Sequence, residues 1–227
     1  MVCYVEMNGL RVLLVGATGG FGSALSTAFG VAGARLVLSG RDAKRLTERR
    51  NALGCQVLAA DLTADGAPED LLAGAAELLG GLDMVVCAVG VVAFGPVSDV
   101  TDDTLRALFE VNTLLPIRLA RASLGVLGRG GVIVNTTGIV ARQPMAGMAA
   151  YSASKAALSA FDIALTREAR RVGVRVLDLC PPHMETGLAT RPLAGSPPNL
   201  PTGRDPAEMA QRVFGALESD GSEVDWS

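Results

Sequence analysis

Aromatic residues are scarce in this chain of 227 residues, where Phe, Trp and Tyr together make up 4%. Histidine and tryptophan occur once each, and the four cysteines lie far apart, at Cys3, Cys55, Cys87 and Cys180. Zinc sites and disulfide frameworks need closely spaced or paired ligands. The sequence therefore predicts no metal site, and it indicates reduced thiols in a cytoplasmic protein.

An excess of positive charge and a long apolar run are also missing. The formal net charge is −3, which does not favour nucleic acid or an anionic membrane as a partner. The longest apolar stretch, 84–94, is too short for the ~20 residues of a membrane-spanning helix. No basic region precedes the first apolar run, so we expect no signal peptide.

Apolar residues, by contrast, make up 49% of the chain, and glycine occurs 27 times. This composition suits one large core built mainly from Ala, Val and Leu. The glycines follow no three-residue period, which excludes a collagen-like chain. The length favours a single domain over residues 1–227.

Short apolar runs alternate with longer segments of helical periodicity. The runs are continuous, which is typical of strands covered on both faces. The pattern predicts an α/β fold with a mostly parallel, doubly wound sheet of about seven strands. Strands are expected at 11–15, 35–39, 56–59, 84–88, 132–136 and 175–179, with a candidate for a short seventh at 223–225. Helices are expected at 21–32, 43–53, 68–79, 101–127, 150–171 and 206–219.

One irregular, proline-rich segment, 181–204, follows the last of the six main strands. Ligands bind at the carboxyl ends of strands in open α/β sheets, and long loops are uncommon unless they are functional. We therefore expect a substrate loop or lid here.

A glycine-rich turn, Gly16-Ala17-Thr18-Gly19-Gly20-Phe21-Gly22, joins the first strand to the first helix. Glycines let the backbone approach a pyrophosphate, which then faces the N–H groups and the dipole of the helix N-terminus. The spacing leaves two patterns open. Gly16, Gly20 and Gly22 fit GxxxGxG, whereas Gly16, Gly19 and Gly22 fit GxxGxxG.

The second predicted strand ends in Ser39-Gly40-Arg41, where a dinucleotide fold binds the adenosine ribose. A carboxylate there would bind the 2′-hydroxyl, whereas an arginine would pair with a 2′-phosphate. Arg41 precedes the next acid, Asp42, so the sequence favours NADP(H) over NAD(H). The alternative is that Arg41 is an ordinary solvated charge.

Tyr151 and Lys155 lie four residues apart at the start of a predicted helix, on one face of it. An ammonium near a phenol favours the phenolate and lowers its pKa from about 10. This pair predicts a general acid/base that exchanges a proton with a carbonyl or an alcohol.

Together these motifs resemble the classical short-chain dehydrogenase/reductase (SDR) family over residues 10–225. The resemblance implies a Rossmann-like three-layer α/β/α sandwich and hydride transfer to or from a nicotinamide. It is carried by the glycine turn, Ser39-Gly40-Arg41, Asp61-Leu62, Cys87-Ala88-Val89-Gly90, Asn112, Val134-Asn135-Thr136-Thr137-Gly138, Tyr151 with Lys155, and the segment from Pro181 to Thr186.

The resemblance also implies roles for single residues. Asp61 would hydrogen-bond the adenine amino group, and Ala88 and Gly90 would flank the adenine ribose. Lys155 would also hold the nicotinamide ribose, and Thr186 would bind near the carboxamide. The full set of implied cofactor contacts is Gly16, Thr18, Gly20, Phe21, Gly22, Ser39, Gly40, Arg41, Asp61, Leu62, Ala88, Val89, Gly90, Tyr151, Lys155, Pro181 and Thr186.

Asn112 matches a family asparagine that holds a water in a proton relay to the lysine. Pro116, four residues later, has no N–H, so the Asn112 carbonyl lacks its helical partner and is free to bind water. The alternative is a simple helix kink.

Three positions depart from the family's pattern. Val15 stands where the family has a threonine, and Pro182 stands where it has a glycine, which removes an N–H near the nicotinamide. Gly138 stands where the family has its catalytic serine. Thr137 can replace that serine only if the strand end bends, which Gly138 would permit.

His183 and Arg142 are further candidates for substrate contact, although each is more simply a solvated side chain. The other expected pocket residues are mostly apolar and favour an uncharged, fairly hydrophobic carbonyl compound, although they could equally be core. They are Val91, Val92, Phe94, Ile139, Met145 and Met184.

The sequence thus favours an NADP(H)-dependent carbonyl reductase or alcohol dehydrogenase with Tyr151, Lys155, Asn112 and Thr137 as catalytic residues. The alternative is a catalytically impaired dinucleotide-binding or regulatory protein, because Gly138 lacks the hydroxyl. A sugar-nucleotide epimerase is disfavoured by the short stretch after Pro181. By analogy we expect a homodimer or homotetramer built on the helices at 101–127 and 150–171.

Overall fold

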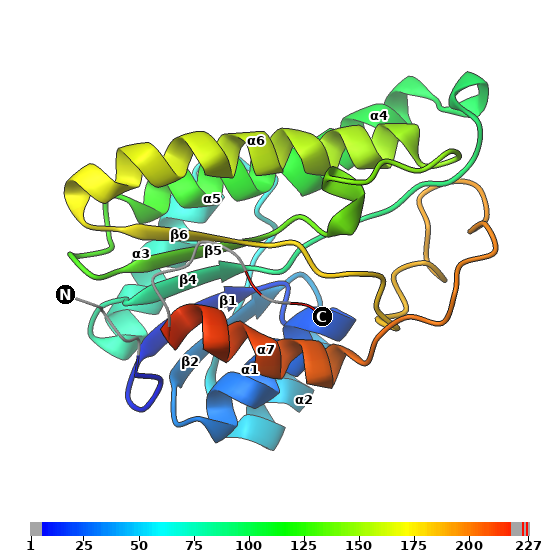
Figure 1. The fold of residues 1–227 in the computed structure, drawn as a ribbon. Coiled ribbons are helices and arrows are strands. Elements are labelled where there is room, and N and C mark those ends of the chain that lie inside the picture. Colours follow the sequence, from blue (N-terminus) through cyan, green and yellow to red (C-terminus); the bar gives the residue numbers. More distant parts are fainter. Residues whose placement is uncertain (1–5, 219–223, 225, 227) are drawn as a thin grey trace.

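The computed structural model describes residues 6–218, 224 and 226 of the chain. Six strands form one parallel sheet in the order β3-β2-β1-β4-β5-β6 (Figure 1). Their bounds are β1 Arg11–Val15, β2 Arg35–Gly40, β3 Gln56–Ala59, β4 Met84–Cys87, β5 Val132–Thr136 and β6 Arg175–Leu179.

The predicted parallel, doubly wound sheet is confirmed. The expected number of about seven strands is corrected to six for the described residues, and the candidate strand at 223–225 falls largely outside them. The chain runs outwards from β1 to β3 and then crosses to β4, which pairs with the other edge of β1. Strand order reverses there, so ligands are expected to bind beyond the carboxyl ends of β1 and β4.

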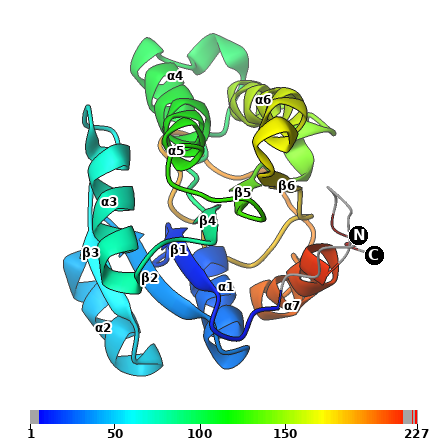
Figure 2. The same ribbon diagram turned by 90° about the vertical axis from the view of Figure 1, so that its left-hand side faces the viewer.

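Helices cover both faces of the sheet (Figures 1 and 2). Alternate side chains of each strand enter different cores: Val12 and Leu14 pack towards one helical layer, and Leu13 and Val15 towards the other. This two-sided burial explains the continuous apolar runs. The first layer holds α1 Gly20–Val31, α2 Ala43–Leu53 and α7 Pro206–Glu218, and the second holds α3 Ala67–Leu79, α4 Asp102–Phe109, α5 Leu115–Ser123 and α6 Ala149–Val172.

The single helix expected at 101–127 is interrupted. α4 ends at Phe109, a π-helical turn follows at Glu110–Leu114 (η2), and α5 ends at Ser123. The Leu115 N–H donates to the Glu110 carbonyl, five residues back. Pro116 has no N–H with which to continue the α-helical ladder, which gives the wider turn a physical cause.

The segment 181–204, which we call the proline-rich loop, leaves the end of β6 and contains one β-bridge, between Met184 and Arg204. Backbone bonds fasten its far part to the segment after β4: Leu193 N–H donates to Val92, and Phe94 N–H donates to Ala194. The loop therefore passes over the carboxyl ends of the central strands.

Candidate active site

The glycine turn after β1 is packed so closely that side chains are excluded at three of its positions. Gly16 has φ +85°, and a Cβ there would lie 2.7 Å from the Ala88 carbonyl oxygen. A Cβ at Gly20 would lie 2.5 Å from the Thr186 carbonyl oxygen, and one at Gly22 would collide with the Gly16 carbonyl. At Gly19 the nearest atom would be 3.3 Å away. The geometry therefore favours the GxxxGxG pattern.

The N-terminus of α1 follows this turn and carries no side-chain cap and no acidic residue in its first turn. The first N–H groups of a helix have no partner within it, and the helix dipole adds about half a positive charge there. An anionic phosphate fits this place, because no carboxylate competes for it and the glycines let it approach the backbone.

At the end of β2, Arg41 is exposed. It lines the cleft that also contains the glycine turn. The carboxylate of the next residue, Asp42, is used as the N-cap of α2, where it accepts from the Arg45 N–H at 3.0 Å. Asp42 lines the cleft as well, but this cap occupies one of its carboxylate oxygens, whereas Arg41 extends from the loop with its charge exposed.

The expected adenosine-binding residues lie around this end of the cleft. Asp61 accepts from the Thr63 hydroxyl at 2.8 Å and from its N–H at 3.1 Å. These bonds lower the pKa of Asp61, and the charge of Arg41 lowers it further. The cleft lining includes Gly16, Thr18, Gly20, Phe21, Gly40, Arg41, Asp61, Leu62, Ala88, Val89, Gly90, Pro181 and Thr186, whereas Gly22 and Ser39 lie behind it.

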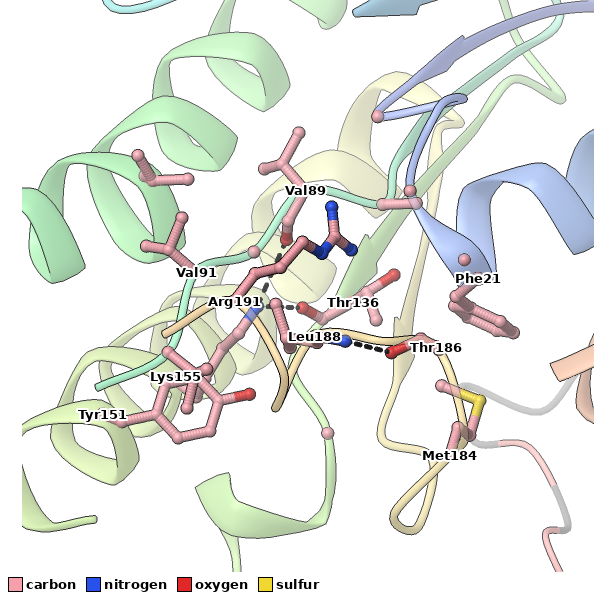
Figure 3. A pocket seen from close by; sticks show the side chains of 18 of the residues that line it. Phe21, Val89, Val91, Thr136, Tyr151, Lys155, Met184, Thr186, Leu188 and Arg191 are labelled. Carbon is pink, nitrogen blue, oxygen red and sulfur yellow. Dashed lines mark hydrogen bonds between the residues drawn. The ribbon is translucent and has the colours of Figure 1, made fainter. Parts of the chain in front are cut away.

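The cleft encloses about 790 Å³ and extends from Arg41 to Tyr151. Tyr151 and Lys155 project into it from α6, one turn apart, with 7% and 3% of their surfaces exposed (Figure 3). The Lys155 ammonium donates to the Thr136 carbonyl at 2.8 Å and to the Val89 carbonyl at 3.4 Å. Its position therefore depends on the ends of β4 and β5.

Burial governs the protonation of this pair. It raises the pKa of Tyr151 to about 12 and lowers the pKa of Lys155 to about 8. The expectation that the ammonium lowers the pKa of the phenol is therefore wrong, because burial raises it. The ammonium donates to two backbone carbonyls, and the loss of hydration dominates at Tyr151.

Asn112 is fully buried in η2, and its side chain joins three elements. Its Oδ1 accepts from the Val91 N–H at 2.9 Å, and its Nδ2 donates to the Val91 carbonyl at 2.9 Å and to Ser154 Oγ at 3.0 Å. The sequence pointed to the Asn112 main-chain carbonyl and missed this side-chain role. The signal available in the sequence was an asparagine one turn before Pro116.

Thr137, expected to replace the family's serine if the strand end bends, lines the cleft. The chain does bend at Gly138, which has φ +90°. However, Thr137 Oγ1 donates to Asp178 Oδ1 at 2.6 Å, and Ser159 Oγ holds the other carboxylate oxygen at 3.0 Å. Half-buried Asp178 of β6 thus binds the hydroxyl that was expected to replace the serine.

Two acids near the site, one half-buried and one buried, were not anticipated from the sequence. Asp178 is one, and Asp162 of α6 is the other, accepting from Asn135 Nδ2 at 2.7 Å. Burial raises the pKa of both, and that of Asp162 reaches about 8. Acidic residues at core positions of a strand and a helix were the signal for them.

The end of the cleft near Tyr151 is mainly apolar. The cleft is lined by Val91, Val92, Phe94, Ile139, Pro182 and His183, and by Met184 on the side of Phe21 (Figure 3), whereas Met145 and Arg142 do not line it. His183 Nε2 lies 3.7 Å from a Glu185 carboxylate oxygen. Further lining comes from residues that were not anticipated: Val140, Met148, Leu188, Ala189, Arg191, Leu193 and Leu200.

Within the described residues, no cluster of three or more His, Cys, Asp or Glu side chains is arranged to hold a metal ion. Over the same residues, none of the helices combines the length and the apolar character needed to cross a membrane.

A glycine turn at the switch point of a parallel sheet, with a buried Tyr–Lys pair across the cleft, defines the class of Rossmann-type oxidoreductases. Within that class, the chain belongs to the short chain dehydrogenase family, whose model matches residues 11–194.

Two relatives show the range of this likeness. The chain is 36% identical over 228 residues to 1-deoxy-11-beta-hydroxypentalenate dehydrogenase of Streptomyces exfoliatus, which covers 95% of this chain and 82% of that protein. It is 32% identical over 234 residues to dehydrogenase/reductase SDR family member 7B of Mus musculus, covering 94% and 72%.

Solved structures agree. A short chain dehydrogenase from Burkholderia cenocepacia in complex with NADP matches with a TM-score of 0.84 and 28% identity, over 96% of this chain and 94% of that one. A short-chain oxidoreductase from Thermus thermophilus matches with a TM-score of 0.78 and 32% identity, over 92% and 96%.

Proposed function

We propose that this protein is an NADP(H)-dependent oxidoreductase that interconverts a ketone and a secondary alcohol, with Tyr151 as its general acid/base. The observation that carries the proposal is that one cleft joins the glycine turn to the buried pair of Tyr151 and Lys155. A dinucleotide lying along this cleft would bring its reactive ring to the phenol.

The described residues fit such a cofactor. Missing side chains at Gly16 and Gly20 leave a cradle for a pyrophosphate beside the N-terminus of α1. Arg41 suits a 2′-phosphate, because the neighbouring Asp42 is engaged as a helix cap. A related structure binds NADP, which supports the same preference. When bound, the cofactor supplies or accepts the hydride.

Tyr151 is suited to the proton-donating direction. With its pKa raised to about 12, the phenol keeps its proton at neutral pH and can give it to a carbonyl oxygen that becomes an alkoxide. Lys155, with a pKa of about 8, is charged below that pH and would hold the nicotinamide ribose beside the phenol. Asn112 fixes Val91 and Ser154 around the pair.

The lining near Tyr151 favours an uncharged, fairly apolar substrate. Val92, Phe94 and Leu188 belong to the cluster that packs around Tyr151. Burying a charge against them would be costly, whereas burying hydrocarbon there is favourable.

The proposal is tested by measuring NADPH oxidation with a panel of apolar ketones, with Tyr151→Phe as the control. We expect turnover in the unsubstituted protein and a loss of at least ~100-fold in kcat/KM in the variant, because the proton donor is removed. Turnover that survives Tyr151→Phe would refute the role of the phenol.

A second candidate function is supported by one specific observation. Gly138 has no hydroxyl and Thr137 turns to Asp178, so a polarising donor beside Tyr151 is missing from the expected position. A dinucleotide-binding protein with little turnover would explain this arrangement. NADPH binding without oxidation of any ketone in the panel would favour that candidate.

A further inference from the structure

The proline-rich loop brings an arginine over the cleft. The loop is fastened on one side by the Met184–Arg204 bridge and on the other by the backbone bond from Leu193 to Val92, at 2.7 Å. Its middle part is therefore held across the cleft, and Arg191 belongs to that part.

A chain of contacts leads from the glycine turn to this arginine. Thr186 lies so close to Gly20 that a Cβ on the glycine would be 2.5 Å from the Thr186 carbonyl oxygen. The next residue, Gly187, accepts from Arg191 Nε at 3.0 Å. The guanidinium is thus tied to the part of the loop that rests on the glycine turn. Figure 3 shows it extending into the cleft.

The positively charged side chains along the cleft are absent from the glycine turn. Of the described charged residues that line it, Arg41, Arg45, Asp42 and Asp61 lie at the adenosine end, and Lys155 lies beside Tyr151. The glycine turn between them carries no charged side chain. A pyrophosphate brings two negative charges to that turn, and the helix dipole offers about half a positive charge.

We propose that Arg191 binds the pyrophosphate of the dinucleotide from the side of the proline-rich loop, opposite the N-terminus of α1. A guanidinium presents paired N–H donors that match two phosphate oxygens. The arginine then completes the phosphate site, which the glycine turn alone leaves open on one side. This inference rests on the proposed function, because it requires that the chain binds a dinucleotide.

The experiment compares the dissociation constants of three probes: NADPH, NADH and adenosine 2′-monophosphate. The first two share the pyrophosphate, and the first and third share the 2′-phosphate. Titration calorimetry is performed on the full chain and on the variants Arg191→Gln, Arg191→Lys and Arg41→Gln. Arg171→Gln, at an exposed position far along α6, is the matched control.

We expect Arg191→Gln to weaken NADPH and NADH by the same factor, about 10- to 100-fold, and to leave adenosine 2′-monophosphate unchanged. Arg191→Lys should lose less, because it keeps the charge but not the paired donors. Arg41→Gln should show the complementary pattern, weakening NADPH and adenosine 2′-monophosphate but not NADH. Arg171→Gln should match the unsubstituted chain.

Three results would overturn the proposal. Unchanged affinity of Arg191→Gln for both dinucleotides would remove Arg191 from the site. A loss for NADPH and adenosine 2′-monophosphate alone would make Arg191 a 2′-phosphate contact instead. Failure of the unsubstituted chain to bind either dinucleotide would overturn both this inference and the proposed function, whereas the first two results would leave the proposed function standing.

Discussion

Gly138 occupies the position at which the catalytic end of the cleft lacks a hydroxyl. A Cβ added there would have one neighbour, the Pro181 carbonyl oxygen at 3.9 Å, so a side chain has room. The backbone, however, has φ +90° and ψ 158°, a conformation essentially restricted to glycine, and an L-residue there costs of order 1–3 kcal/mol. The available space therefore permits a side chain at residue 138, whereas the backbone conformation disfavours one.

We predict that Gly138→Ser raises kcat/KM for an apolar ketone by about 100- to 1,000-fold, because one added donor to a developing oxyanion has an effect of this order. The melting temperature should fall by ~2–12 °C, since the strained backbone lowers the free energy of unfolding. Gly138→Ala is the control, with the same strain and no hydroxyl. Equal activity of the two variants would contradict the prediction.

Asp162 gives a prediction about pH and stability. Burial raises its pKa from 3.8 to about 8, so the folded protein keeps a proton that the unfolded chain releases in this range. The free energy of unfolding therefore falls as pH rises from about 4 to 8, by up to ~1.4 kcal/mol per pH unit. Asp162→Asn should flatten this slope between pH 5 and 7.5, because it keeps the acceptor for Asn135 and removes the titration.

Thermal or urea unfolding across that pH range measures the effect. Asp65→Asn, a change at an exposed position, should leave the slope as it is. Parallel slopes for Asp162→Asn and the unsubstituted protein would show that Asp162 does not hold the proton. Lys155 contributes little to this slope, because its lowered pKa of about 8 lies above the pH range of the measurement.

At the scale of elements, η2 is the part of the structure that links the loop after β4 to α6. Asn112 alone makes three hydrogen bonds across this junction. Each buried polar group left without a partner costs about 1–3 kcal/mol. The conformation of the cleft wall at Val91 therefore depends on the Asn112 side chain.

We expect Asn112→Ala to lower the free energy of unfolding by about 2–4 kcal/mol and to speed amide hydrogen exchange at Val91, whose N–H loses its acceptor. Thr113→Val is the matched control. It removes the neighbouring 2.7 Å bond from Thr113 Oγ1 to the Ser154 carbonyl but leaves Val91 paired. Equal exchange at Val91 in both variants would contradict the role of Asn112 as a link.

The elements also show what the sequence could predict. The strands were predictable to within a residue, because buried parallel strands are continuous apolar runs bounded by polar residues. The glycine turn and the helical spacing of Tyr151 and Lys155 are local patterns, and the structure places both in one cleft.

Features that depend on distant residues were not predictable. The direction of the Thr137 hydroxyl is set by Asp178, 41 residues later in the chain. The π-helical turn interrupts a segment whose apolar periodicity continues through it, so Pro116 indicated a kink but not its form. The protonation of Tyr151 follows from burial, which no spacing of residues reveals.

At the scale of the whole molecule, the layer formed by α4, η2, α5 and α6 exposes large apolar side chains. Leu105, Leu114 and Ile163 are 37%, 42% and 61% exposed, and they lie on elements that share one side of the sheet (Figure 2). Apolar groups gathered on one face favour association. A two-fold dimer would bury the same layer of both copies, which agrees with the expected homodimer or homotetramer.

We therefore predict that the protein forms a homo-oligomer through this layer and that Ile163→Glu dissociates it, because each two-fold contact would bury two like charges. Sedimentation velocity should show a multiple of the chain mass for the unsubstituted protein and a smaller species for the variant. Val31→Glu is the matched control, since Val31 is 82% exposed but lies on α1, in the opposite helical layer. If Val31→Glu dissociated the oligomer and Ile163→Glu did not, the interface would lie on the opposite layer. A monomer in all three samples would show that the exposed apolar side chains of the α6 layer do not hold copies together.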